Sequence, residues 1–400
     1  MAAIVRECIQ AIELLALHRA NPARYPHLLQ SVASGRYDIL FACPGDSLVL
    51  QQDSLLHPDG RRVPAGDFLD GLDAWWQQLS TGPAENSLPF SGGWFVYLGY
   101  ELAARIEPTL QFEYSDPLLP VAFATRFATA VIHDRDRGAA FITGEPGTER
   151  DMDAIEADIA DLSKSGAPVR QAIQATRIAE QPDRDYLDAV TRIKNYIVEG
   201  DVFQVNLSRE WDIRFAERAD PAALYSNLCW HNPAPFSGLA NWQDTAIISS
   251  SPERLVRVRD GIVETRPIAG TRPRSKTQAR DEEFSAELMS NPKERAEHIM
   301  LIDLERNDLG RLCMPGSVEV NEFMKLESYA HVHHIVSNVR GRLRDEITPG
   351  AVLRAVFPGG TITGCPKVRC MEIIAELELA ARGAYTGSMG YLNCDGSMDM

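Results

Sequence analysis

Two acids in the segment 291–310 have a spacing that suits a metal site. Glu294 and Glu297 are three residues apart, so a helix would place both on one face. Asn291 is placed to cap that helix, and Pro292 suits its first turn. Proteins often hold Mg²⁺ with one or two carboxylates. A solvated acidic face, with Glu294 serving the helix cap, is the alternative interpretation.

A glycine-rich loop at residues 358–364 runs into a helical pattern, with Pro366 near its start. Backbone N–H groups and the helix dipole make such a loop a candidate anion site. Gly359 and Gly364 have the outer spacing of a nucleotide-binding P-loop, but Cys-Pro-Lys stands where Lys-Ser/Thr is required. We therefore reject an ATP site and retain two interpretations, a carboxylate-binding loop and a purely structural turn.

Candidate proton donors lie in two other segments. Glu253 follows a run of serines and is either a surface acid or a general acid whose pKa is raised by burial. His331, His333 and His334 form a cluster with no cysteine or acid at zinc-ligand spacing. One histidine in acid/base or orienting work is more plausible than a metal site, and a satisfied strand histidine is the alternative.

A predicted hairpin brings Glu253 toward the sequence RPIAGTRPR, residues 266–274. Asp260-Gly261 is a strong two-residue turn signal between strand-like residues 246–258 and 262–270. The two strands then place Ala269 near Glu253. Arginines around a flexible glycine indicate a backbone held close to an anionic ligand.

Other elements follow from hydrophobic periodicity and turn signals. Residues 163–182 are predicted to form a linker, and Gly200 to cap the helix that follows it. We expect helices at 9–17, 149–164 and 186–200, a strand at 201–211, two strands around a Pro-Gly turn at 37–53, a strand entering a helix at 92–103, and a hairpin at 122–144.

Composition excludes several classes of protein. The chain is 44% hydrophobic and 24% charged, which argues against disorder, and no apolar run approaches the roughly 20 residues of a membrane span. A net charge of −16 argues against nucleic acid as a partner. Seven scattered cysteines indicate reduced thiols, so we predict a cytoplasmic location.

Six segments occur together, in an order that resembles the chorismate-utilising enzymes. The resemblance is dense over 185–400 and weaker before that. It implies an α+β fold of two large, mostly antiparallel β-sheets packed together with helices outside. It also implies an N-terminal region at 1–165 and a chorismate-binding catalytic region at 183–400. The segments are GDVFQVNLS, SSSPERL, RPIAGTRPR, NPKERAEHIMLIDLERNDLGR, HHIVSNVRG and FPGGTITGCPKVRCMEII.

The same resemblance implies roles for individual residues. Glu253 matches the general acid that helps the C4 hydroxyl leave, and His334 matches a histidine near the leaving group. Glu294 and Glu297 match acids that hold Mg²⁺ on the ring carboxylate. The remaining predicted substrate-binding residues are Gln204, Ala269, Thr271, Thr361, Gly364 and Tyr385.

Three positions bear on the branch of the family. Water-using members have a lysine base where this chain has Gln204, so the resemblance favours ammonia as nucleophile. Asn206 favours the aminodeoxychorismate branch over the anthranilate branch. Ala269 argues against it, because the best-known aminodeoxychorismate synthases have a reactive lysine there. A non-catalytic regulatory subunit that binds chorismate or tryptophan is the alternative from another class.

The resemblance also implies partners. A separate glutamine amidotransferase subunit would supply ammonia. A tryptophan pocket is predicted, although an ordinary packed strand pair would explain the same segments. Family members continue past the position of Met400, so we expect an interrupted copy of a longer active enzyme. The predicted tryptophan-binding residues are Ser31, Arg36, Tyr37, Pro235, Phe236 and Ser237.

Overall fold

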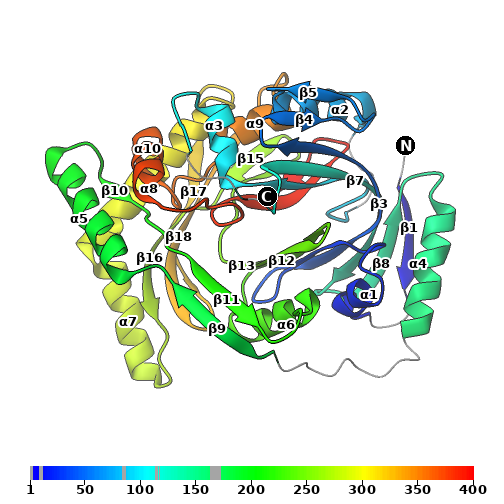
Figure 1. Ribbon diagram of the computed structural model, residues 1–400, viewed down its shortest axis with the longest axis horizontal. Helices are drawn as coiled ribbons and strands as arrows, with labels where there is room; N and C mark the ends of the chain where they lie inside the picture. The colour runs from blue at the N-terminus through cyan, green and yellow to red at the C-terminus, as the bar shows by residue number, and fades with distance from the viewer. Residues whose placement is uncertain (1–2, 9–11, 83–86, 113–115, 117, 163–172) are drawn as a thin grey trace.

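One large antiparallel sheet organises the molecule. The computed structural model describes residues 3–8, 12–82, 87–112, 116, 118–162 and 173–400. The strands of the main sheet are hydrogen-bonded into a closed arrangement, and two small two-stranded sheets lie beside it. Figure 1 shows helices around the outside, with α5 (Asp183–Glu199) and α7 (Gln278–Ser290) at one end and α4 (Glu149–Leu162) at the other. This arrangement confirms the predicted α+β class.

The first half supplies long strands to this sheet. The predicted hairpin at 122–144 forms as β7 and β8. The elements of the first half of the chain are β1 Ile4–Cys8, α1 Leu14–Ala20, β2 His27–Gln30, β3 Tyr37–Gln51, β4 Ser54–Leu56, β5 Arg62–Pro64, α2 Phe68–Leu79, β6 Gly93–Leu98, the 3₁₀ turn Tyr100–Leu102, α3 Ala103–Ile106, β7 Ala122–Asp134, β8 Ala139–Gly144 and α4 Glu149–Leu162.

Two predictions in the first half are wrong in detail. The segment 37–53 is not two strands around a turn, because β3 pairs with β7 along its length. The pairing continues past Pro44 through a register shift between Pro44 and Ser47. The helix predicted at 9–17 begins only at Leu14. Residues 9–11 lie outside the described residues, and Ile4–Cys8 pair with β8 as a strand. In both cases a partner strand decided the local structure.

The second half alternates helices with strands that join the same sheet. The predicted helix at 186–200 forms as α5, and Gly200 ends it with a φ of 86°. The elements are α5 Asp183–Glu199, α6 Pro221–His231, β12 Phe236–Trp242, β13 Thr245–Ser251, β14 Arg257–Arg259, β15 Ile262–Thr265, β16 Ile268–Pro273, α7 Gln278–Ser290, α8 Pro292–Gly310, β17 Glu319–Ser328, β18 Val332–Arg342, α9 Pro349–Val356, α10 Lys367–Leu377, β20 Ser388–Asn393 and β21 Met398–Asp399.

The strand predicted at 201–211 does not form as one element. Only Gln204–Val205 (β10) pair, with Gly364–Cys365 (β19). Trp211–Phe215 (β11) pair instead with Ala175–Glu180 (β9). The predicted linker therefore contains a strand, and residues 163–172 of it lie outside the described residues. An alternating pattern predicts a strand only where a partner runs alongside.

The predicted hairpin around Asp260-Gly261 is also shorter than expected. β14 and β15 pair across that turn, but β13 ends at Ser251 and β16 pairs with β18. Proline has no N–H to donate to a ladder, so the strand stops before Pro252. The interruption frees Glu253 from the sheet ladder.

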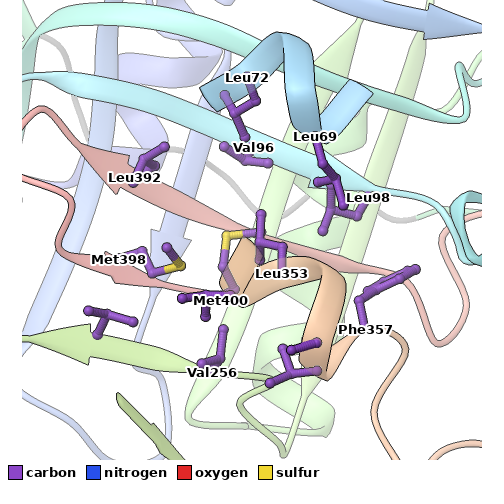
Figure 2. Close-up of a cluster of buried hydrophobic side chains, with 14 of the residues drawn as sticks. Leu69, Leu72, Val96, Leu98, Val256, Leu353, Phe357, Leu392, Met398 and Met400 are labelled. Carbon is purple, nitrogen blue, oxygen red and sulfur yellow. The ribbon is translucent and has the colours of Figure 1, made fainter. Parts of the chain in front are cut away.

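Strands from the two halves of the chain share one core. β12 pairs with β2, and β20 pairs with β6. Figure 2 shows Leu72 and Val96 from the first half in one buried cluster with Leu353, Leu392 and Met398 from the second. Burial of each such side chain contributes about 1.5–3 kcal/mol. The two halves therefore stabilise each other.

Candidate active site

Glu253 lies on the wall of a large cavity, just after the break in β13. The cavity has a volume of about 1470 Å³, and Thr361 and Tyr385 also line it. The Oε1 atom of Glu253 accepts hydrogen bonds from Thr361 Oγ1 at 2.8 Å and from the N–H of Ile268 at 3.3 Å. The predicted proximity of Glu253 to the 266–274 segment is thus observed.

The environment of Glu253 favours its protonated form. Removal from water raises the pKa of Glu253 to about 8, and the charge of Glu305 adds to this effect. The two hydrogen bonds from Thr361 and Ile268 oppose it. Near neutral pH the group carries a proton that it can donate, as a general acid must.

The loop that carries Thr361 is fixed by backbone contacts. The Thr363 hydroxyl is buried and donates to Gly359 O at 2.9 Å. Gly364 has a φ of +133°, and a Cβ atom there would lie 2.1 Å from the carbonyl oxygen of Gln204. Only glycine therefore fits at that close approach. Gly359 and Thr361 line the cavity, whereas Gly364 and Gln204 are not among its lining residues.

Gln204 has a distinct environment behind this loop. Its Oε1 atom is buried and accepts no hydrogen bond from the part of the chain that the structure describes. A buried acceptor without a partner is costly, so such an atom is suited to a bound ligand. The predicted substrate contact at Gln204 stays a prediction.

A second group of predicted residues lies along the β16–β18 pair. Thr271 stands opposite His334 in the register, and Thr271 Oγ1 lies 3.0 Å from His334 Nδ1. Burial lowers the pKa of His334, so the ring is neutral near neutral pH. Ala269 is buried opposite Ile335. None of Ala269, Thr271 and His334 is among the residues that line the cavity.

The two candidate metal ligands lie beside this strand. Asn291 caps α8 as predicted, by accepting from the N–H groups of Lys293 and Glu294. A Cβ atom added to Gly270 would lie 3.0 Å from Glu294 Oε2, which places that carboxylate against the bulge of β16. Glu294 also accepts from Arg272 at 3.1 Å. Glu297 is partly buried one turn further along.

Glu294 and Glu297 suit a hard dication that takes most of its ligands from water and substrate. Among the described residues, no group of three or more metal-binding side chains occurs. Mg²⁺ commonly takes one or two carboxylates and completes its shell with water and substrate oxygens. Glu294 and Glu297 supply that number, although Arg272 competes for Glu294.

The six predicted tryptophan-binding residues are brought together by strand pairing. Ser237 stands opposite Gln30 where β12 pairs with β2, and all six residues line the same cavity as Glu253. Arg36 is already held by Asp134 through bonds of 2.9 and 2.7 Å. Its guanidinium is therefore part of the cavity wall and is already paired with a carboxylate. Tryptophan binding itself stays a prediction.

Sequence reasoning missed Glu305, which also lines the cavity. This side chain is 6% exposed, and removal from water raises its pKa to about 7. A signal was present in the helical pattern. Glu305 lies four residues from both Leu301 and Leu309, on the apolar face of α8, where an unpaired acid is unusual.

It also missed Arg382, whose buried guanidinium bonds to Glu378 at 2.6 and 2.8 Å. Arg382 also donates to the carbonyl oxygens of Asn206 and Ile362, and so joins two segments of the site. An isolated arginine in a loop gives no sequence signal of this kind.

Comparison with known proteins identifies the family. A model described as chorismate binding enzyme matches residues 34–400. The chain belongs to this family. Aminodeoxychorismate synthase component 1 of Bacillus subtilis is 39% identical over 398 residues, covering 96% of this chain and 82% of that protein. Anthranilate synthase component 1 of Pseudomonas putida is 38% identical over 401 residues, covering 93% and 80%.

Solved structures of the chorismate-utilising family agree with the fold. Anthranilate synthase component I of Streptococcus pneumoniae superimposes with a TM-score of 0.78 at 30% identity, covering 91% of this chain and 82% of that one. The menaquinone-specific isochorismate synthase of Escherichia coli gives 0.74 at 17% identity, which bears on the fold alone. The predicted family and fold are confirmed, and relatives of both aminating branches are similar to this member.

Two features of the chain bear on its location. No helix in the described ranges is long and apolar enough to cross a membrane. All seven cysteines are free thiols. The cytoplasmic location stays a prediction.

Proposed function

We propose that this family member is component I of an aminodeoxychorismate synthase, which replaces the C4 hydroxyl of chorismate with an amino group for 4-aminobenzoate and folate synthesis. The observation that supports it most is the position of Glu253 on the cavity wall, where removal from water raises its pKa to about 8. Hydroxide is a poor leaving group, so a carboxyl that donates its proton is what C4 substitution requires. The Bacillus subtilis relative supports the choice of branch.

Ammonia is the proposed nucleophile, supplied by a glutamine amidotransferase subunit in the cytoplasm. The names of the relatives describe them as component 1 of their synthases, which motivates the second subunit. The resemblance to water-using members aligns Gln204 with their lysine base, and an amide cannot accept a proton from water. Ammonia can attack through its lone pair without first losing a proton to a base.

Mg²⁺ is the proposed cofactor, held by Glu294 and Glu297. When bound, it would neutralise a substrate carboxylate and polarise it. Thr271 and His334 lie on the adjacent strands and would orient the substrate through their hydroxyl and neutral ring. The amides of the loop around Thr361 would face another carboxylate.

Anthranilate synthase component I is the second candidate. Ala269 favours this candidate, because its methyl side chain cannot form a covalent adduct with the ring. The Streptococcus pneumoniae structure and the Pseudomonas putida relative also support it. Amination would then occur at C2 rather than at C4.

One assay separates these functions. The full chain is incubated with chorismate, Mg²⁺ and ammonium, and the products are identified by chromatography and mass. We expect a product that added lyase converts to 4-aminobenzoate. Fluorescent 2-aminobenzoate would instead establish the second candidate. Chorismate binding without turnover would contradict both and indicate a regulatory subunit.

A further inference from the structure

A second carboxyl group shares the cavity with Glu253. Glu305 reaches the cavity from α8, and Glu253 reaches it from the break after β13. The two are close enough that the charge of Glu305 raises the pKa of Glu253. Two acids in one water-poor site cannot both ionise readily, so one is held protonated while the other carries the charge.

The neighbours of Glu305 leave its carboxylate free to take a proton. Lys367 favours its charged form, but the Lys367 ammonium is bonded to Asp308 at 2.6 Å and to the carbonyl of Val356 at 3.2 Å. The charge of Asp308 acts in the opposite direction. No described ion pair uses the Glu305 carboxylate itself.

The loop at residues 359–364 lies against both acids. A Cβ atom added to Gly360 would lie 3.5 Å from Glu305 Oε1, and the backbone of Gly360 favours the charged form of that carboxylate. The hydroxyl of Thr265 also favours the charged form of Glu305. It makes no hydrogen bond with the described residues. Thr361, the next residue in the loop, donates to Glu253. Consecutive residues of the loop thus contact the two acids.

We propose that Glu305 is the base that accepts the proton released by the incoming nitrogen nucleophile. This inference rests on the proposed amination of chorismate. Glu253 and Glu305 then have complementary roles, the first as acid toward the leaving oxygen and the second as base toward the entering nitrogen.

The step balances without any further reactant. The nitrogen lone pair of ammonia forms the new C–N bond, and the bond from the ring to the leaving hydroxyl breaks. The Glu253 proton passes to that oxygen, which departs as water. The nitrogen, which then carries three hydrogens, gives one proton to Glu305. Ammonia and an alcohol become an amine and water, and exchange with solvent restores both carboxyl groups.

Other candidate bases are less suited to this role. His334 is bonded to Thr271 on the β16–β18 pair and does not line the cavity. Asp308 is held by Lys367 and by Arg311 at 2.7 Å. Among these three groups, only Glu305 lines the cavity, and removal from water raises its pKa to about 7.

The test compares Glu305→Gln with the wild-type chain. Amination rates are measured with chorismate, Mg²⁺ and ammonium and are expressed per concentration of free ammonia. We expect kcat to fall at least about 100-fold, the usual lower limit for a lost general base, while the KM for chorismate is unchanged. Glu305→Asp retains the carboxylate and should recover part of the loss. Asp303→Asn, on the exposed face of α8, is the control.

A pH profile supplies the readout that a structural role would not change. A base must be unprotonated, so the wild-type rate per free ammonia should rise with pH through about 7 and fall above about 8 as Glu253 loses its proton. The Gln variant should lose the rise near 7. Its fall should remain but move to lower pH, because the charge of Glu305 that raises the pKa of Glu253 is gone.

The outcomes are distinct. Wild-type amination with a Glu305→Gln rate within about threefold would overturn the role of Glu305 and leave the proposed function intact. If the wild-type chain forms no aminated product, the proposed function fails, and this inference fails with it. If the Gln variant unfolds, the Asp variant and the wild-type profile decide the question, and a profile without a rise near 7 contradicts the proposal.

Discussion

Glu253 combines a local sequence feature with a tertiary environment. Pro252 ends β13 and removes Glu253 from the ladder, while Thr361 and Ile268 come from distant segments to bind its carboxyl. Burial then keeps the carboxyl protonated. Its chemistry therefore depends on both the break in the strand and the walls around it.

The first prediction concerns the proton of Glu253. Glu253→Gln keeps the shape and the contact with Thr361 but removes the transferable proton. We expect kcat to fall by about 10²–10⁴-fold while chorismate binding, measured by titration calorimetry, stays within about twofold. Glu199→Gln, at the exposed end of α5 and outside the cavity, is the matched control. Near-normal turnover in Glu253→Gln would contradict the general-acid role.

The second prediction concerns the metal site. Glu297→Gln keeps the side-chain volume and removes one carboxylate ligand, so Mg²⁺ affinity measured by calorimetry in the presence of chorismate should fall at least about tenfold. Glu283→Gln, on the exposed surface of α7, is the matched control. Unchanged Mg²⁺ affinity in Glu297→Gln would exclude this residue as a ligand.

At the scale of elements, Arg382 links segments that the sequence keeps far apart. It contacts the carbonyl oxygens of Asn206 and Ile362, and its ion pair with Glu378 is almost completely buried, at 2% and 7% side-chain exposure. Glu101, from the first half of the chain, accepts from the Arg382 N–H at 2.8 Å. Short strands such as β10 hold their position through this network rather than through long ladders.

The third prediction tests that network. Arg382→Met leaves Glu378 buried without its cation, and loss of one partner from a buried pair costs about 3–5 kcal/mol in free energy of unfolding. Arg192→Met breaks an exposed arginine–glutamate pair with Glu376 and should cost less than about 1 kcal/mol. Urea denaturation measures both variants. Equal losses would show that the Arg382 pair adds no more than a surface contact.

At the scale of the whole molecule, the two halves of the chain fold around a common core. Leu72 on α2 is fully buried in the cluster that contains Leu353 and Leu392 from the second half (Figure 2). The main sheet also joins the two halves, through the β2–β12 and β6–β20 strand pairs. The halves are therefore expected to unfold together.

The fourth prediction tests this shared core. Leu72→Ala should lower the free energy of unfolding by about 2–5 kcal/mol, because it removes buried methyl groups and leaves a cavity. Circular dichroism and tryptophan fluorescence should report one coincident transition in urea. Leu118→Ala, at a side chain that is 70% exposed, should have little effect. Separate transitions for the two probes would show that the halves fold independently.

The sequence by itself determined the elements whose signals are local. The capped helix α8, the Asp260-Gly261 turn and the glycine at the end of α5 depend on backbone geometry and on neighbours within four residues. The role of Glu253 as a general acid was also visible as a hypothesis, because the segment SSSPERL occurs in a recognisable order of segments. Confirmation of the family followed from the order of those segments.

Only the tertiary structure decided which residues share a cavity and how they titrate. Glu305 and Glu253 are 52 positions apart in the numbering, yet they line the same cavity, and the charge of Glu305 raises the pKa of Glu253. The bulge that lets β3 continue past Pro44 and the shortening of the strand at 201–211 were likewise set by partner strands. Pairing and burial depend on distant parts of the chain, so local periodicity cannot determine them.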